Sequence, residues 1–280
     1  MTRLAVLGSP IGHSKSPLLH AAAYRELGLD WQYSAVDVTG AGLAEFVRSR
    51  DESWRGLSLT MPLKRDVLPL LDSLDDTARL AGGANTVLFD RDGAGTALRG
   101  FNTDVYGVTE AFRQSGVATL GRVLVLGGGA TAASVVVAAR RLGAHTVAVA
   151  VRDPARAGSL VELGASVGCA VTVHPLDTVD SLPAPDAVVS TIPGHSEHGL
   201  GFVADVRSHA VLFDVAYDPW PSELAASWLE AGGRVISGLE MLLHQAVAQV
   251  RVFVGGDPDT ALPDEARVLA AMRASVAVGG

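Results

Sequence analysis

Short apolar runs alternate with longer segments of helical length along almost the whole chain, and this alternation constrains the fold more than any other feature of the sequence. It is typical of β–α–β units built on a mainly parallel sheet. The run 123–126 is apolar at every position, as expected of a strand that helices cover on both faces. We therefore predict an α/β protein. Its predicted strands are 4–7, 32–36, 56–59, 86–89, 123–126, 146–150, 187–190, 211–215 and 234–236, and its predicted helices include 17–27, 43–48, 104–114, 131–142, 155–163 and 222–231.

The predicted elements divide into two domains. Residues 1–103 form an N-terminal α/β domain with a mainly parallel sheet, and residues 104–238 form a second series of strands and helices. Two further helices, predicted at 238–254 and 263–278, have no strand left to follow. We expect this last part, about 239–280, to return and complete the first domain. The chain would then pass between the two domains twice and leave a cleft between them, and clefts are preferred ligand sites.

Composition limits the partners and the compartment. Thirty acidic residues against 22 basic ones give a net charge of −8, which argues against nucleic acid because phosphate binding needs a basic face. The single cysteine, Cys169, excludes a disulfide framework and a cysteine-based zinc site. No segment reads as a signal peptide or a membrane span. We expect a cytoplasmic protein, either a monomer or a homodimer, with neither nucleic acid nor a membrane as partner.

The turn after the apolar run 123–126 matches a nucleotide-binding fingerprint. It fits G-x-G-x-x-A between a strand and a helix, the context that a Rossmann-type dinucleotide site requires. Gly127 permits the tight turn, Gly129 lets the backbone approach a pyrophosphate, and Ala132 lets helix and strand pack closely. The N–H groups at the start of the helix then face the phosphates. The predicted cofactor-binding turn comprises Gly127, Gly128, Gly129, Ala130, Thr131 and Ala132. A glycine-rich turn that binds nothing is the structural alternative.

The residues after the next predicted strand bear on the choice of cofactor. Arg152 and Arg156 favour NADP, because a guanidinium group suits the 2′-phosphate of the adenosine ribose. Asp153 argues for NAD, whose free 2′-hydroxyl an acidic residue would bind. Since Asp153 precedes Pro154, it is also explained as a helix N-cap. We predict NADP, with NAD less favoured. Ordinary surface charge is the alternative explanation for both arginines.

Four polar clusters interrupt the first domain where its strands end. They are Ser14-Lys15-Ser16, the segment 58–64, Gly83-Ala84-Asn85-Thr86 and Asn102-Thr103-Asp104. Such hydroxyl, amide, ammonium and carboxylate groups suit a small polyhydroxylated ligand. Each cluster also has a structural explanation on its own: Ser16 as an N-cap, Asn85 as a turn residue and Asn102 or Thr103 as a cap.

Lys64 and Asp104 are the pair predicted to transfer a proton. Lysine can release its proton when neighbours lower its pKa, whereas arginine stays protonated, and a nearby carboxylate would orient the ammonium group. The chain has 20 arginines and only two lysines, Lys15 and Lys64, so a lysine at this place needs a reason. A surface ion pair is the alternative. A metal site is not expected, because His195 and His198 have only Glu197 as a nearby carboxylate.

Taken together, these motifs resemble those of the shikimate dehydrogenase family over nearly the full length. Residues 8–17 resemble the family's S-x-S loop, which implies that Ser14 and Ser16 bind the substrate carboxylate. Residues 60–64 match its T-x-P-x-K segment, and residues 84–86 and 102–104 match its A-N-T and N-T-D elements. The resemblance implies that Lys64 and Asp104 are catalytic and that the substrate-binding residues are Ser14, Ser16, Ser58, Thr60, Asn85, Tyr217 and Gln245.

The last motifs concern the cofactor as well. Residues 214–219 resemble a D-x-x-Y-x-P loop, which puts Tyr217 near substrate and the Val215 backbone near nicotinamide. Residues 238–246 resemble a G-L-x-M-L-x-x-Q-A helix, in which Gly238 and Met241 would contact the cofactor and Gln245 the substrate. The chain departs from the family in three places: at Ser58, where asparagine is frequent, at Ala130 in the turn, and at Asp153.

The resemblance implies the reversible reduction of 3-dehydroshikimate to shikimate with NADPH, in chorismate and aromatic amino-acid biosynthesis. Residues 1–103 with about 239–280 would bind the substrate, and residues 104–238 would bind NADP. Two alternatives stay open: a quinate/shikimate dehydrogenase that prefers NAD, and a non-catalytic dinucleotide-binding sensor of the same fold. A sensor would be expected to lack Lys64 or Asp104, and both are present.

Overall fold

The structure is a computed structural model of the 280-residue chain, and it describes residues 1–91, 95–193 and 200–277. The chain forms two compact units. Unit 1 comprises Met1–Gly107 and Leu242–Gly280, and unit 2 comprises Val108–Met241. Among the described residues, no helix combines the length and the apolar character needed to span a membrane.

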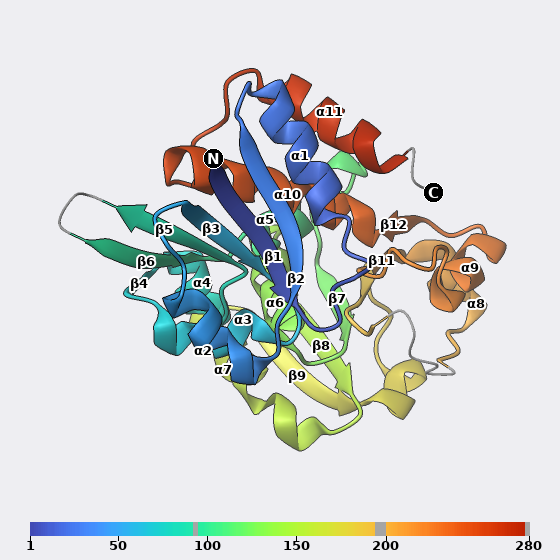
Figure 1. The fold of residues 1–280 in the computed structure, drawn as a ribbon. Helices are drawn as coiled ribbons and strands as arrows, with labels where there is room; N and C mark the ends of the chain where they lie inside the picture. Colours follow the sequence, from blue (N-terminus) through green and yellow to red (C-terminus); the bar gives the residue numbers. More distant parts are fainter. Residues whose placement is uncertain (92–94, 194–199, 278–280) are drawn as a thin grey trace. The chain divides into compact units, whose positions relative to one another are not determined.

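Unit 1 contains a six-stranded mixed sheet (Figure 1). Its strand order is β2 (Trp31–Asp37), β1 (Thr2–Gly8), β3 (Trp54–Leu59), β5 (Thr86–Arg91), β6 (Thr96–Phe101) and β4 (Ser73–Leu74). β1 pairs parallel with β2 and β3, and β4 with β6, whereas β5 pairs antiparallel with β3 and β6. The helices associated with this unit are α1 (Ser16–Glu26), α2 (Gly40–Arg48), α3 (Leu63–Asp66), α4 (Asp76–Ala81), α11 (Glu265–Ala277), the start of α5 (Asp104–Gln114) and most of α10 (Gly238–Gly255).

The C-terminal helices are an integral part of unit 1. α11 packs beside α1, as Figure 1 shows. α10 lies close against β3, because a Cβ atom on Gly56 would overlap the ring of Phe253. Arg55 fixes the same contact by donating from Nε to the Phe253 carbonyl at 2.7 Å. The apolar core beneath α2 and α3 includes Leu57 and Leu63, both fully buried.

Unit 2 contains a six-stranded sheet that is parallel throughout. Its order is β12 (Val235–Ser237), β11 (Val211–Asp214), β10 (Ala187–Ser190), β7 (Arg122–Leu126), β8 (Thr146–Val151) and β9 (Ala170–Pro175). Counted within the unit, this is the order 6-5-4-1-2-3 of the Rossmann fold, whose direction of winding reverses between β7 and β10. Its helices are α6 (Ala130–Arg141), α7 (Gly158–Val167), α8 (Ala204–His209) and α9 (Glu223–Glu230), with 3-10 turns at Pro154–Ala157 and Leu176–Ser181.

The predicted α/β class with mainly parallel sheets and a Rossmann-type unit is confirmed. One local prediction is wrong: Ser16 is not the N-cap of α1. The helix starts at Ser16, Lys15 occupies the cap position, and no side chain caps the helix there. Pro17 in the first turn has no N–H to satisfy, which lowers the need for a cap. The prediction that Asp153 caps the following helix is confirmed, since its carboxylate accepts from Ala155 N–H at 3.2 Å.

Candidate active site

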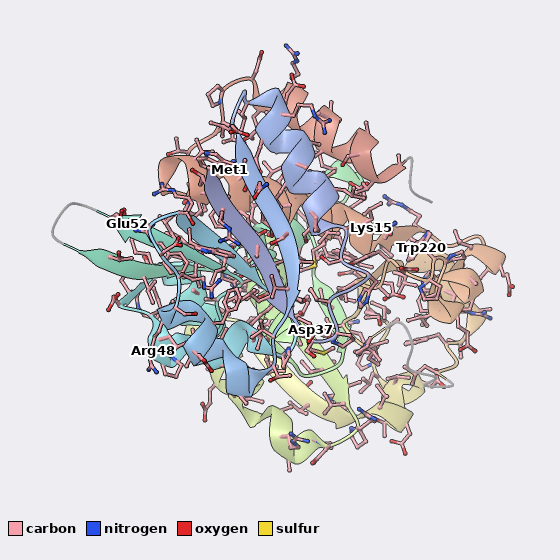
Figure 2. The ribbon with its side chains drawn as sticks, viewed as in Figure 1. Met1, Lys15, Asp37, Arg48, Glu52 and Trp220 are labelled. Atoms are coloured by element: carbon pink, nitrogen blue, oxygen red, sulfur yellow. The ribbon has the colours of Figure 1, made fainter. Side chains whose placement is uncertain are left out.

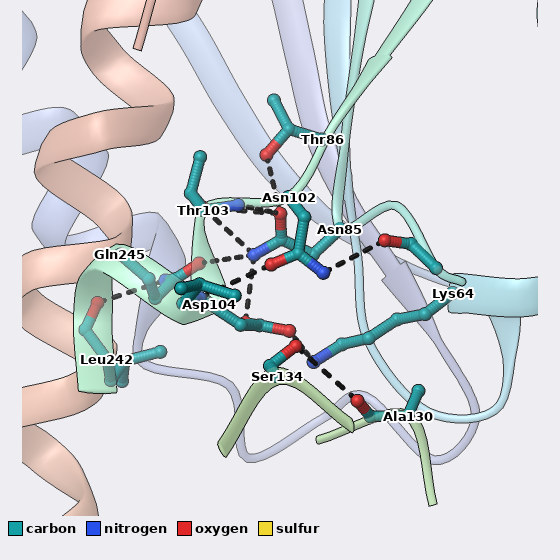
Figure 3. Close-up of polar contacts among 12 residues, drawn as sticks. Lys64, Asn85, Thr86, Asn102, Thr103, Asp104, Ala130, Ser134, Leu242 and Gln245 are labelled. Atoms are coloured by element: carbon teal, nitrogen blue, oxygen red, sulfur yellow. Dashed lines mark hydrogen bonds and ion pairs between the residues drawn. The ribbon is translucent and has the colours of Figure 1, made fainter. Parts of the chain in front are cut away.

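Lys64 and Asp104 form a largely buried ion pair in unit 1. Nζ of Lys64 lies 2.6 Å from Oδ2 of Asp104, and the two side chains are 13% and 4% exposed. Lys64 is in α3, shortly after the carboxyl end of β3, and Asp104 is the first residue of α5, shortly after the end of β6. Figure 3 shows the lysine side chain extended toward the carboxylate. The predicted pair is thus in direct contact, with a proton-bearing nitrogen held by an oriented carboxylate.

Asn85 connects this pair to the helix α10. Its Nδ2 lies 2.9 Å from Oδ1 of Asp104, 2.9 Å from Oγ1 of Thr103 and 3.2 Å from Oε1 of Gln245 (Figure 3). Its Oδ1 accepts from the backbone N–H of Thr103 at 2.8 Å, which fixes the orientation of the amide. Lys64, Asp104, Asn85 and Gln245 therefore form one connected cluster in unit 1.

This cluster has more acceptors around Asn85 than the amide can serve. An amide NH₂ group has two hydrogens, and three acceptor oxygens lie within 3.2 Å of it. The charged Asp104 is the strongest acceptor, so Gln245, at the longest distance, is the partner most easily exchanged for a ligand hydroxyl. Gln245 is itself positioned by donating from Nε2 to the Leu242 carbonyl at 2.9 Å.

Three further predicted residues of unit 1, Ser14, Ser16 and Thr60, come from two other segments of the chain. Oγ of Ser14 accepts from the backbone N–H of Ser16 at 3.3 Å, so the two serines are neighbours where the loop meets α1. Figure 2 labels Lys15, the residue between them in sequence. Thr60 follows β3 and is held by its backbone N–H, which donates to the Leu7 carbonyl at 2.9 Å. No hydrogen bond within the described chain links the side chains of these three residues to Lys64 or Asp104.

Ser58 is more enclosed than the sequence suggested. It is 3% exposed, accepts from the hydroxyl of Tyr33 at 2.7 Å and donates to Oε1 of Gln249 at 2.9 Å. Sequence reasoning did not single out Tyr33, Gln249 or their neighbour His20. For Gln249 a signal existed, because a polar side chain four residues after Gln245 shares its helix face.

In unit 2 the glycine-rich turn lies at the point where the sheet winding reverses. Gly127 has a φ of +100°, which favours glycine, and a Cβ there would collide with Oγ1 of Thr191, directly after β10. Gly129 is the N-cap of α6, and a Cβ on it would meet nothing within 4 Å. Its backbone therefore faces open space, whereas Ala132 is fully buried. This arrangement fits a pyrophosphate at the start of α6.

The arginines predicted to select NADP follow β8, the strand next to β7. Arg152 and Arg156 are both exposed, and within the described residues neither guanidinium group makes a hydrogen bond or ion pair. Asp153, between them, is occupied as the cap of the next turn. The ribose end of a dinucleotide would thus meet two exposed guanidinium groups, which suits a 2′-phosphate.

The last predicted cofactor contacts are also in unit 2. A Cβ on Gly238 would overlap the backbone of Val215, so glycine is required where α10 starts beside the loop after β11. Met241 follows within the first turn of α10 and is 8% exposed, and Tyr217 in the loop is partly exposed. His195 and His198 lie outside the described residues. Within the described ranges no group of three or more His, Cys, Asp or Glu side chains is arranged to hold a metal ion.

These features define a class of protein: an α/β chain with a Rossmann-type nucleotide unit and a separate unit that carries a Lys–Asp pair. The chain matches the family model of the shikimate dehydrogenase substrate binding domain over residues 6–87. It is 36% identical to the shikimate dehydrogenase (NADP⁺) of Rubrobacter xylanophilus over 263 residues, 91% of this chain and 92% of the relative. It is 34% identical to the enzyme of the same name from Methanococcoides burtonii over 260 residues, 91% of this chain and 93% of the relative.

Solved structures agree with this relationship. The crystal structure of Mycobacterium tuberculosis shikimate dehydrogenase superposes with a TM-score of 0.84 at 40% identity, covering 98% of this chain and 100% of that one. The shikimate 5-dehydrogenase of Thermus thermophilus, solved in complex with NADP(H) and shikimate, gives a TM-score of 0.79 at 31% identity over 98% and 100% of the two chains. The chain belongs to the shikimate dehydrogenase family.

Proposed function

We propose that the chain catalyses the reversible, NADPH-dependent reduction of 3-dehydroshikimate to shikimate in aromatic amino-acid biosynthesis. The observation that carries the proposal is the buried Lys64–Asp104 pair at 2.6 Å, in a chain with full-length relatives named shikimate dehydrogenase (NADP⁺). On this proposal, unit 1 binds the substrate and unit 2 binds NADP. When bound, the reduced nicotinamide supplies the hydride that converts the ring ketone to an alcohol.

The residues of unit 1 supply the proton and hold the ring. Lys64 holds a proton on Nζ and donates it to the alkoxide oxygen that develops from the ketone. Asp104 orients the ammonium group through Oδ2, and Asn85 fixes the carboxylate by donating to Oδ1. In the oxidation direction Lys64 accepts the proton from the substrate hydroxyl. Ser14 and Ser16 bind the carboxylate of the ring, and Ser58, Thr60, Asn85, Tyr217 and Gln245 bind its hydroxyl groups.

The residues of unit 2 hold the dinucleotide. The N–H groups at the start of α6 and the glycine backbone bind the pyrophosphate. Arg152 and Arg156 bind the 2′-phosphate, and Val215, Gly238 and Met241 contact the nicotinamide end. The free, buried thiol of Cys169 accords with a reducing compartment, and we propose the cytoplasm as the location and a monomer or a homodimer as the assembly.

A matrix of initial rates tests this function. Shikimate and quinate are each offered with NADP⁺ and with NAD⁺, and reduction of the cofactor is followed by its absorbance. We expect the highest kcat/KM for shikimate with NADP⁺. A higher kcat/KM for NAD⁺ with either substrate would identify an NAD-preferring quinate/shikimate dehydrogenase instead. Nucleotide binding without turnover of either substrate would identify a sensor.

A further inference from the structure

A buried polar network lies behind Asn85, and Gln249 is its centre. Gln249 is 2% exposed on α10. Its Nε2 donates to the main-chain carbonyl of Asn85 at 3.2 Å, and its Oε1 accepts from Ser58 at 2.9 Å and contacts Nε2 of His20 at 3.2 Å. One side chain therefore joins α10 to α1, to β3 and to the residue directly before β5.

Every hydrogen bond around Gln249 has a fixed direction. The Asn85 carbonyl can only accept, so the NH₂ end of the Gln249 amide must face it and the oxygen must face Ser58 and His20. His20 then donates from Nε2, and its Nδ1 accepts from the hydroxyl of Tyr24 at 3.1 Å. The His20 ring also stacks on Tyr33 at 3.8 Å between ring centroids. Burial lowers the pKa of His20 to about 3, against the raising effect of its hydrogen bond to Gln249, so the ring stays neutral near pH 7.

Gln249 and Gln245 contact Asn85 at two different points. The two glutamines are four residues apart on α10 and share a helix face. Gln245 accepts from the side-chain amide of Asn85 at 3.2 Å, and Gln249 donates to its main-chain carbonyl at 3.2 Å. The Asn85 carbonyl also accepts from the Leu59 backbone N–H at 2.8 Å, so two donors, one from β3 and one from α10, converge on it.

We propose that Gln249 is a positioning residue for substrate binding, which it controls by fixing the backbone of Asn85 and the hydroxyl of Ser58. This inference rests on the proposed function, because it takes Asn85 and Ser58 as substrate-binding residues. Gln249 itself acts through them. Because Ser58 donates its single proton to Gln249, its remaining lone pair can only accept, and so it suits a ring hydroxyl rather than a carbonyl oxygen.

The variant Gln249→Glu tests the proposal with little change of shape. Its carboxylate still accepts from Ser58 and His20, but it presents an oxygen instead of an N–H group to the Asn85 carbonyl. We expect the KM for shikimate to rise about tenfold, because the Asn85 carbonyl loses one of its two donors and faces a carboxylate oxygen in its place. The KM for NADP⁺ should stay within about twofold, and kcat should fall less than about threefold, since Gln249 does not contact Lys64 or Asp104.

Val250→Ala is the matched control. Val250 is the next residue of α10 and is fully buried, so its truncation lowers thermal stability without touching the network. A KM for shikimate that is unchanged in Gln249→Glu, or that rises equally in Val250→Ala, overturns the proposal. If Gln249→Glu does not fold, Gln249→Met is measured instead, and failure of both to fold also overturns it in favour of a structural role. Absence of shikimate turnover by the unsubstituted protein overturns the proposed function itself and this inference with it.

Discussion

Among single residues, Lys64 has the clearest chemical reason to be lysine rather than arginine. Its ammonium group is largely buried and bonded to one carboxylate oxygen, while Asn85 occupies the other. In a chain with 20 arginines and two lysines, arginine is the expected cation at any place that needs only charge. A guanidinium group would pair with Asp104 equally well, but it would not give up its proton.

Lys64→Arg and Lys64→Ala should therefore both lose turnover. We expect kcat for shikimate oxidation to fall about 10²–10⁴-fold in each, the usual contribution of a general acid–base group, with a smaller change in substrate affinity. The measurement is steady-state kinetics together with shikimate titration by calorimetry. Lys15→Arg, which replaces the other lysine, should keep kcat within about twofold. Full turnover in Lys64→Arg would remove Lys64 from the proton-transfer role.

His20 should make stability depend on pH. Burial lowers its pKa from 6.5 to about 3 in the folded chain. Between pH 6.5 and pH 3 the unfolded chain binds a proton on His20 that the folded chain does not. The free energy of unfolding is therefore highest above pH 6.5 with respect to this group and decreases as the pH falls toward 3. The loss is up to about 1.4 kcal/mol per pH unit. Urea unfolding of the wild type and of His20→Gln at about pH 5 and about pH 7.5, either side of the unfolded pKa, tests this, and equal pH slopes would contradict it.

The motif residues of the site could be predicted from sequence, whereas the network behind them could not. Lys64, Asn85 and Asp104 lie near strand ends, where an α/β sheet gathers polar side chains regardless of tertiary detail. His20 and Gln249 lie inside helices, and only the packing of α1 and α10 around the sheet reveals that they meet. The two residues are 229 positions apart in sequence, so no local sequence pattern could predict their contact.

At the scale of elements, the strands that escaped prediction share a cause. β9 is at the edge of its sheet and ends in Pro175, and β4 is two residues long. β6 has a glycine, Gly100, where a Cβ would overlap Leu71. Short, edge or glycine-containing strands have weak apolar patterns because neighbouring elements, rather than their own residues, supply the stability.

A largely buried ion pair between α10 and α11 should contribute to stability. Arg251 of α10 lies 2.7 Å and 2.6 Å from the carboxylate oxygens of Glu265 in α11, and it also donates to the hydroxyl of Tyr106 at 3.0 Å. Glu265→Gln leaves this guanidinium group, 8% exposed, without its counter-charge. We expect a loss of about 2–4 kcal/mol in unfolding free energy by urea titration.

An exposed ion pair of α11 provides the comparison. Arg267 of α11 pairs with Glu26 of α1, and its side chain is 72% exposed. Arg267→Ala should cost at most about 1 kcal/mol, because solvent screens the pair. Equal losses in the two variants would show that burial does not strengthen the Arg251–Glu265 pair.

At the scale of the whole molecule, the chain passes from unit 1 to unit 2 within α5 and returns within α10. Unit 1 is therefore built from both ends of the sequence, whereas unit 2 is continuous. A ligand that binds only folded unit 2 stabilises it by RT ln(1 + [L]/Kd), which is about 2.7 kcal/mol at a concentration of about 100 times Kd. Thermal unfolding of the intact chain thus reports which dinucleotide unit 2 prefers.

The two exposed arginines after β8 should decide that preference. We expect NADP⁺ to raise Tm by several degrees, since about 1 kcal/mol corresponds to about 2–4 °C in a chain of this size, and NAD⁺ at the same concentration to raise it less. The double variant Arg152→Ala/Arg156→Ala should lose most of the NADP⁺ shift and keep the NAD⁺ shift, because only the 2′-phosphate distinguishes the two ligands. Arg113→Ala removes a half-exposed arginine of α5 and should leave both shifts unchanged. An NADP⁺ shift that survives the double substitution would mean that groups other than these two arginines bind the 2′-phosphate.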